Sequence, residues 1–160
     1  KYDRVFYSDA DRTFTKLTKP RLLFDWGYAT IDADIVKVKA DGKYHMMIKK
    51  EGGKRGIFAT YSDKLTGPWP EPDEKDFVRF EGNKQCEGAS AFQLAGDDTW
   101  RVGYVEYSSN PTKYRICKAD KFLRNFHSPS DIKGVKAPQH GSFLQLTKKE
   151  YKRLEKFFGK

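Results

Sequence analysis

The feature that most constrains the fold of this chain is an internal repeat of about 55 residues. One series of similar segments is led by Asp9, Asp63 and Asp120, which are spaced by 54 and 57 residues. In each segment an aspartate follows the end of an expected strand and precedes a short turn and an aromatic residue. A fixed period of this length predicts repeated structural units, because each unit can bury its apolar face only against its neighbours.

A second series runs in phase with the first. Its leading residues are Asp32, Glu87 and His140, spaced by 55 and 53 residues. After the first two we expect a strand, a turn rich in Gly and Asp, and further strands over residues 43–49 and 99–107. Apolar and polar side chains alternate there with a period of two, which is typical of antiparallel strands. The repeat therefore predicts an all-β fold of β-propeller blades; the main alternative is a solenoid, whose repeats are usually shorter and often helical.

The end of the chain is predicted to be helical. Thr147 and Glu150 fit the N-cap and N3 positions of a capping box, and Tyr151, Leu154 and Phe158 then fall on one helical face. We expect this short helix to pack on the rim of the propeller. The predicted organisation is one partial propeller domain over residues 1–160, with late strands of a blade at 1–30, blades at 31–85 and 86–138, and a closing strand and helix at 139–160.

The charge balance is basic, with 31 Lys and Arg against 22 Asp and Glu and a net charge of +9. Three basic pairs are scattered along the chain: Lys49–Lys50, Lys54–Arg55 and Lys148–Lys149. Because no block of like charges and no RNA-binding signature is present, we expect a solvated surface and no nucleic-acid partner. No apolar run approaches the ~20 residues that span a bilayer, so we expect no membrane span.

Two further features bear on the compartment of the chain. Cys86 and Cys117 fit no metal-binding spacing; one disulfide or two half-buried thiols remain, and we favour the thiols. The chain begins at Lys1 instead of Met, so we expect either that a leader was removed or that the chain is a piece of a longer protein.

Three titratable side chains are predicted to share one pocket. The first strand of each propeller blade lines the central channel, so Asp32, Glu87 and His140 would converge at one end of it. The alternative is that each is a turn or capping residue at the start of a strand, where Asp is common. Both interpretations stay open from the residues alone.

The same segments resemble motifs of glycoside hydrolase family 43. Residues 31–36, Ile-Asp-Ala-Asp-Ile-Val, resemble a segment in which Asp opens an inner strand and tunes the pKa of the catalytic acid. Residues 87–92, Glu-Gly-Ala-Ser-Ala-Phe, resemble the general-acid segment, and residues 140–142 resemble a later motif whose His lies near the channel axis. With similar stretches at 24–28 and 146–154, the resemblance covers nearly the whole chain.

The resemblance implies a fold, a reaction and roles for residues. The chain would be the C-terminal part of a five-bladed propeller that hydrolyses arabinofuranosides or xylosides of plant polysaccharides with inversion. Glu87 would be the general acid, and ionised Asp32 would raise its pKa by like-charge repulsion. His140 would bind substrate, water or a metal; no cofactor is required, although the central channel is a place for Ca²⁺.

Two departures from the family put the activity in doubt. The family's usual Pro after Glu-Gly is Ala89 here, and family members are about twice as long. Inversion also needs a general base with the two carboxyls ~6.5–9.5 Å apart, and the family takes it from the first blade. We find no inner strand near the N-terminus that is preceded by an Asp. Asp3, Asp9 and Asp11 are poor candidates, because Asp9 belongs to the outer series with Asp63 and Asp120. We therefore expect little activity from this chain alone, and completion by a second copy or by a missing N-terminal half of the propeller.

Aromatic side chains near these motifs are candidates for sugar binding. Trp26 and Tyr28 precede the strand that carries Asp32, and Tyr107 ends the strand expected at 99–107. Trp69 belongs to the outer repeat, so we expect it to pack between blades.

Three functions stay open. The first is a family 43-like glycosidase, and the second is a non-catalytic carbohydrate-binding propeller or half-propeller. The third is a structural or polyanion-binding β domain. For the first two we expect a secreted, periplasmic or cell-surface protein of a bacterium, with an oligo- or polysaccharide as partner.

Overall fold

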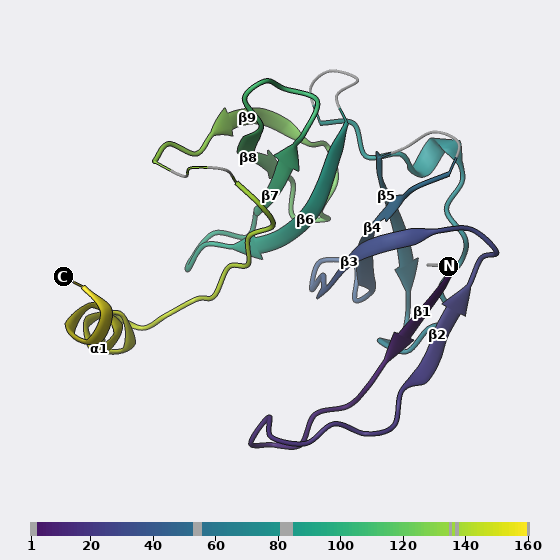
Figure 1. Cartoon of the computed structure of the whole chain (residues 1–160), viewed down its shortest axis with the longest axis horizontal. Helices are drawn as coiled ribbons and strands as arrows, with labels where there is room; N and C mark the ends of the chain where they lie inside the picture. The colour runs from purple at the N-terminus through teal and green to yellow at the C-terminus, as the bar shows by residue number, and fades with distance from the viewer. Residues whose placement is uncertain (1–2, 53–55, 81–84, 135, 137, 160) are drawn as a thin grey trace.

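The computed structural model describes residues 3–52, 56–80, 85–134, 136 and 138–159. Tyr2, expected in the first strand, and the basic pair Lys54–Arg55 lie outside the described residues. The described part contains nine strands, one short 3₁₀ turn (Glu74–Asp76) and one helix (Figure 1). The strands are β1 (Arg4–Tyr7), β2 (Arg21–Asp25), β3 (Thr30–Lys37), β4 (Tyr44–Lys50), β5 (Gly56–Ser62), β6 (Cys86–Gln93), β7 (Trp100–Glu106), β8 (Lys113–Ala119) and β9 (His127–Asp131), and the helix is α1 (Lys148–Phe158).

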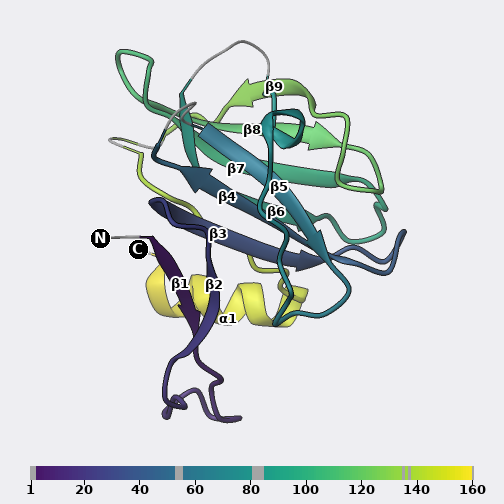
Figure 2. The same cartoon turned by 90° about the vertical axis from the view of Figure 1, so that its right-hand side faces the viewer.

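The strands form three antiparallel sheets in chain order. β1 pairs with β2, the second sheet has the order β3-β4-β5, and the third has the order β6-β7-β8-β9. Such up-and-down sheets are the blades of a propeller. Figure 1 shows the two larger sheets as neighbouring layers, and Figure 2 shows the β1–β2 hairpin extending beyond them. The predicted all-β fold of antiparallel blades with a short C-terminal helix is confirmed.

Within the described residues, a fourth strand of the second sheet is represented by a single bridge. Phe77 forms an isolated antiparallel bridge with Phe58 of β5, and the N–H of Val78 donates to the carbonyl of Ile57. In the third sheet β9 pairs with β8 and completes the blade.

The main core lies between the two larger sheets. Val38 and Met47 from the second sheet are packed in one cluster with Val102 and Cys117 from the third. A second cluster fills the space between β2 and β4 and contains Trp69, which is 5% exposed, as expected for a packing aromatic. Each sheet therefore packs against the next, which brings the starts of β3 and β6 close together.

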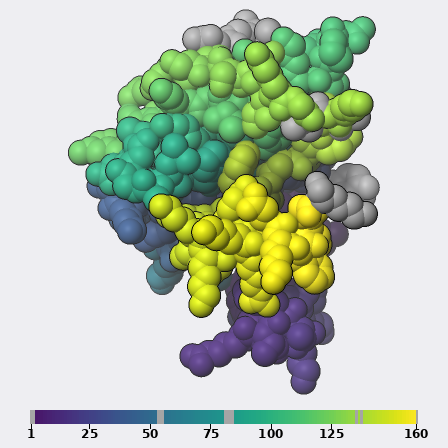
Figure 3. Space-filling view, turned by 90° about the vertical axis from the view of Figure 1, so that its left-hand side faces the viewer, coloured from purple at the N-terminus to yellow at the C-terminus, as the bar shows by residue number. Residues whose placement is uncertain are grey.

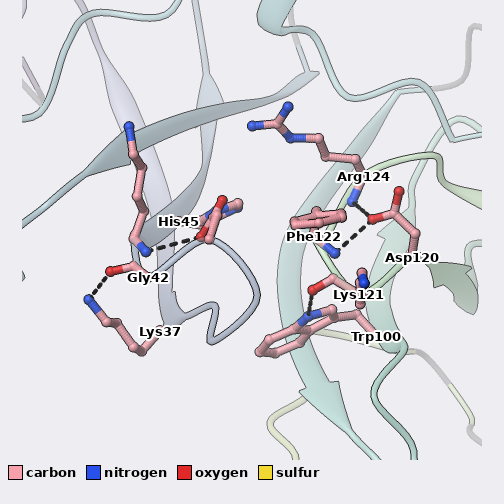
Figure 4. A network of polar contacts seen from close by, with 10 residues as sticks. Lys37, Gly42, His45, Trp100, Asp120, Lys121, Phe122 and Arg124 are labelled. Atoms are coloured by element: carbon pink, nitrogen blue, oxygen red, sulfur yellow. Dashed lines mark hydrogen bonds and ion pairs between the residues drawn. The ribbon is translucent and has the colours of Figure 1, made fainter.

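Tight turns join the outer strands of the blades. Figure 4 shows one of them, in which the carboxylate of Asp120 accepts the backbone N–H of Phe122 and of Arg124, and the indole of Trp100 donates to the carbonyl of Lys121. The third residue after Asp120 in this turn has a left-handed φ of 54°.

The outer repeat is real, but its register differs from the prediction. The same i to i+3 backbone hydrogen bond closes turns that start at Asp11, Lys64 and Asp120. The equivalent residues are therefore not Asp9, Asp63 and Asp120. The three turns share a backbone conformation, in which the residue three positions after the first has a left-handed φ. This conformation does not require aspartate at the first position.

The segment after residue 138 corrects two expectations. Residues 139–144, predicted as a closing strand, form none; a strand exists only by pairing with a neighbour, and none of the described strands pairs with them. Phe143 instead stacks on Phe92 of β6 with ring centroids 4.0 Å apart.

Helix α1 forms where it is expected but does not pack on a rim. Its capping box is present, with Thr147 and Glu150 hydrogen-bonded reciprocally. All of its described residues are exposed, and it lies apart from the sheets (Figure 1). In the space-filling view of Figure 3 the helix faces the viewer. No helix in the described part of the chain is long and apolar enough to cross a membrane.

Candidate active site

The structure brings together the three side chains that the inner repeat singled out. Nε2 of His140 lies 3.6 Å from Oδ2 of Asp32 and 3.6 Å from Oε1 of Glu87. One oxygen or nitrogen of each of the three lies within 4.8 Å of the others. Asp32 comes from β3, Glu87 from β6, and His140 from the segment that follows β9. The group is partly open to solvent, since the side chain of His140 is 43% exposed.

A bulge at the start of each inner strand aims the two carboxylates. The ladder register shifts between Ile31 and Asp34 in β3, and between Glu87 and Ser90 in β6. Asp32 has φ 58° and its counterpart in the bulge of β6 is a glycine with φ 60°. Bulges re-aim side chains beside active sites, and Asp is one of the few residues that tolerate the left-handed region.

The bulges correct the predicted equivalence of the two carboxylates. Because Ile31 and Glu87 both stand immediately before the bulge, Asp32 corresponds to Gly88 and not to Glu87. The two carboxylates therefore approach the same spot from neighbouring blades at positions one residue apart.

Gly88 allows His140 to lie against the backbone of β6. A Cβ at Gly88 would lie 2.5 Å from Cδ2 and 2.6 Å from Cγ of the imidazole. The segment carrying His140 is held close on its other side as well, because a Cβ at Gly141 would lie 2.4 Å from the hydroxyl of Tyr114. In the Glu87–Gly88 pair, the first residue thus supplies the carboxylate and the second leaves room for the imidazole of His140.

Lys49 is a site residue that sequence reasoning missed. It belongs to β4, its side chain is 6% exposed, and its Nζ lies 2.5 Å from Oε2 of Glu87 and 2.8 Å from Oε1 of Glu51. In the ladder it lies opposite Ile31, one residue before Asp32. A lysine at the end of a strand is ordinarily solvated, so Lys49 was interpreted from the sequence as one member of a solvated basic pair.

The ion pair with Lys49 changes the electrostatics expected for Glu87. Burial alone would raise the pKa of Glu87, but the hydrogen bonds and positive charges of Lys49 and His140 hold this pKa below its ordinary value. The pKa of Glu87 was predicted to rise through repulsion by Asp32, and in the resting site it is lowered instead. Burial would lower the pKa of Lys49, and Glu51 and Glu87 outweigh this and raise it. The resting site holds an ionised carboxylate beside a buried ammonium.

Tyr107 lies at the site, but one face of its ring is occupied. The Nζ of Lys49 lies 4.7 Å from the centroid of that ring, within the range of a cation–π contact. Lys49 thus links Glu87 to Tyr107.

The other predicted sugar-binding aromatics lie in packing contacts. Trp26 stacks on Phe24 with centroids 3.9 Å apart, and its indole N–H lies 3.4 Å from the carbonyl oxygen of Trp69. The ring of Tyr28 faces the ammonium of Lys50 at 4.3 Å. Burial, with the contribution of Glu71, raises the pKa of Tyr28. Their part in sugar binding stays a prediction.

A further, half-buried carboxylate ties the two inner strands together. Oδ2 of Asp34 in β3 accepts the backbone N–H of Ala91 in β6 at 2.9 Å. Burial raises the pKa of Asp34 although this hydrogen bond acts in the opposite direction. Asp34 was not predicted as a site residue.

The N-terminal carboxylates are engaged within the β1–β2 hairpin. Asp9 pairs with Arg21, and Oδ1 of Asp11 accepts the backbone N–H of Thr15 at 2.9 Å. Both carboxylates therefore have partners within the hairpin that carries them, and that neither is the general base stays a prediction.

Ca²⁺ is the cation that the resemblance implies, and its preferred ligands can be compared with the donors of the site. Oδ2 of Asp32 is buried without a hydrogen-bond partner, which would suit a ligand atom. However, Ca²⁺ takes six to eight oxygen ligands, whereas the group offers an imidazole nitrogen and two carboxylates, of which Glu87 is already neutralised by Lys49. The residues present therefore fit Ca²⁺ poorly.

The family comparison agrees with the motifs. A family model described as a probable glycosyl hydrolase domain, related to glycoside hydrolase family 43, matches residues 1–152. Among solved structures, a thermostable family-43 glycoside hydrolase matches 84% of this chain with 18% identity and a TM-score of 0.45. The chain spans about half of that structure, covering 52% of its length. None of the curated proteins matches the chain.

Proposed function

This chain belongs to the family of probable glycosyl hydrolase domains related to family 43, and we propose that it carries the acid half of an inverting glycosidase site. The proposed substrates are arabinofuranosides or xylosides of plant polysaccharides. The observation that carries the proposal is the convergence of Asp32, Glu87 and His140 from three separate segments on one open spot. The proposed compartment is the outside of a bacterial cell, where such polysaccharides are met.

Glu87 is the proposed proton donor to the leaving oxygen. It is more exposed than Asp32, with 26% of its side chain accessible against 17% for Asp32. To act as an acid it must first take up a proton, and Asp32 favours this by like-charge repulsion while Lys49 opposes it. The proton must therefore arrive with the substrate, when the sugar displaces water from the carboxylates.

The general base is proposed to come from outside this chain. Inversion needs a second carboxylate to activate water on the opposite face of the sugar. We propose that a second copy of the chain or a further part of the protein supplies it, so hydrolysis is expected only from the complete assembly.

Substitution of Glu87 by Gln in that assembly tests the proposal. Gln keeps the shape of the side chain but cannot transfer a proton, so hydrolysis of a substrate with a poor leaving group should fall roughly 10²–10⁴-fold. An activated aryl glycoside needs less protonation and should lose less. Asp32→Asn serves as the matched variant that removes only the repelling charge, and it should lower the pH at which activity is greatest. Unchanged turnover of an oligosaccharide by Glu87→Gln would refute the assignment of Glu87.

Non-catalytic carbohydrate binding is the second candidate function. The specific observation in its favour is the ion pair of Lys49 with Glu87, because an ionised carboxylate accepts hydrogen bonds from sugar hydroxyls but donates none. Calorimetric titration with arabino- and xylo-oligosaccharides separates the two functions. Binding without any cleavage by the complete protein would favour the binding module, and Glu87→Gln should then weaken affinity without a leaving-group dependence.

A further inference from the structure

Helix α1 is an amphipathic helix without a partner. Its apolar side is formed by Tyr151, Leu154, Phe157 and Phe158, which are 58%, 43%, 80% and 71% exposed. The arm that leads to it adds Leu144, which is 86% exposed. Apolar side chains gathered in this way on a surface mark an interaction site.

The helix is also short for one that stands alone. It has 11 residues, whereas isolated helices shorter than ~12–15 residues are marginal in water even when their sequence favours helix. Figure 1 shows it at the end of an extended arm, and the space-filling view in Figure 3 shows it projecting in front of the sheets. Its capping box stabilises the N-terminal turn, but the apolar side contributes nothing to stability until something covers it.

The charge of the helix indicates what kind of surface covers it. Five basic residues stand against two acidic ones between residues 148 and 158. The basic residues occupy the side opposite the apolar one: Lys148, Lys149, Lys152, Arg153 and Lys156. Long basic side chains beside an exposed aromatic and aliphatic strip are the pattern of helices that lie in a membrane interface.

Charge also argues against a second copy of the chain as the occupant. The whole chain carries a net charge of +9, so a second copy meets the basic helix with repulsion. An anionic bilayer attracts it, with about 1 kcal/mol for each Lys or Arg near the surface.

The match to the glycosyl hydrolase family ends within helix α1. It covers residues 1–152, so Leu154, Phe157 and Phe158 lie beyond the matched residues.

We propose that α1 binds this protein to anionic lipid membranes, with Leu154, Phe157 and Phe158 inserted at the interface and the basic side chains toward the headgroups. This role is independent of the proposed hydrolysis and would hold the propeller at a bilayer surface without spanning it.

Co-sedimentation of the full chain with vesicles tests the proposal. The wild-type chain should bind vesicles of phosphatidylcholine containing phosphatidylglycerol, should not bind vesicles of phosphatidylcholine alone, and should be released by about 0.5 M NaCl, where charges are strongly screened. Leu154→Ser with Phe158→Ser should abolish binding. Because both side chains are exposed, the β-sheet circular dichroism and the tryptophan fluorescence should not change.

Two charge-reversal variants with the same net charge complete the design. Reversal of Lys149, Lys152 and Lys156 to Glu should weaken binding by roughly 100-fold or more. Reversal of three exposed lysines on other parts of the chain, Lys16, Lys19 and Lys64, should change it by less than about threefold at the same salt. Equal losses in the two variants would show that net charge and not the helix binds the vesicles, and would overturn the proposal. Analytical ultracentrifugation is run in parallel; a dimer that Leu154→Ser and Phe158→Ser dissociate, without vesicle binding by the wild type, would also overturn it.

Discussion

Replacement of Gly88 by Ala is expected to disturb the candidate site through two separate effects. Gly88 has φ 60°, where an L-residue costs roughly 1–2 kcal/mol more than glycine. The added Cβ would also lie 2.5–2.6 Å from two ring carbons of His140, well inside the ~3.5–4.0 Å of ordinary carbon contacts. The imidazole cannot retreat with its backbone, because Gly141 is closed in by the hydroxyl of Tyr114. Overpacking of this kind costs typically about 1–3 kcal/mol, so the sum is about 2–5 kcal/mol.

Urea unfolding followed by tryptophan fluorescence measures this cost, and two controls separate its parts. Gly42→Ala has the same backbone cost, since Gly42 has φ 73°, but a Cβ there meets nothing within 4 Å. It should therefore lose only about 1–2 kcal/mol. In a His140→Ala background, Gly88→Ala should cost about as much as Gly42→Ala, because the ring is gone.

Either of two results would contradict the contact between His140 and Gly88. Gly88→Ala could cost no more than Gly42→Ala, or its cost could be the same with and without the imidazole of His140. Both would mean that His140 does not lie over Gly88, and the convergence of the three titratable side chains would lose its support.

Three further outcomes follow from the site and the core. Lys49→Met should raise the pKa of Glu87, which ¹³C NMR titration of the carboxyl carbon can follow. In the wild type, the lowered pKa of Glu87 stabilises the folded chain above the ordinary carboxyl pKa, and this stabilisation is lost as the pH falls through the lowered value. The variant should lose this pH dependence of stability. Asp34→Ala leaves the N–H of Ala91 without its acceptor and should cost about 1–3 kcal/mol in urea unfolding, whereas Asp34→Asn keeps an acceptor and should cost less. Because the pKa of Asp34 is raised, its ionisation should lower stability as pH rises from the ordinary value through the raised one, and Asp34→Asn should not show this loss. Burial raises the pKa of the Cys117 thiol to about 12, so this thiol should resist a disulfide reagent at pH 8 in the folded chain and react after unfolding; reaction without unfolding would contradict the packing.

The repeat predicted the blades because its signal is local. Alternation of side chains and a turn at Gly42 are enough to specify β4 and its neighbours, since each strand pairs with the next one in the chain. The strand expected at 139–144 was predicted only from its place in the repeat, and it does not form, because none of the described strands pairs with it. A sequence repeat therefore predicts a strand correctly only where a neighbouring strand is available to pair with it.

The candidate site was predicted in outline and missed in its electrostatics. Asp32 and Glu87 share a sequence period, but the bulges displace their equivalence by one residue, and a bulge has no sequence mark when Asp takes the left-handed position. Lys49 was missed for a different reason. Its burial is a property of two sheets packed together, because β4 supplies the ammonium and β6 supplies the carboxylate of Glu87. No pattern within one strand contains that information.

The environment of Lys49 decides whether the site can serve hydrolysis at all. A buried ammonium that loses a carboxylate partner is destabilising, so protonation of Glu87 would be costly if Glu87 were the sole counter-ion of Lys49. Glu51 lies 2.8 Å from the same ammonium and remains beside it when Glu87 becomes neutral. A proton can then reside on Glu87 without leaving the positive charge unpaired. The Glu51–Lys49–Glu87 arrangement is therefore compatible with two states of Glu87: an ionised carboxylate that binds a sugar and a protonated carboxyl that cleaves it. The desolvation that an occupied site imposes on Glu87 selects between these two states.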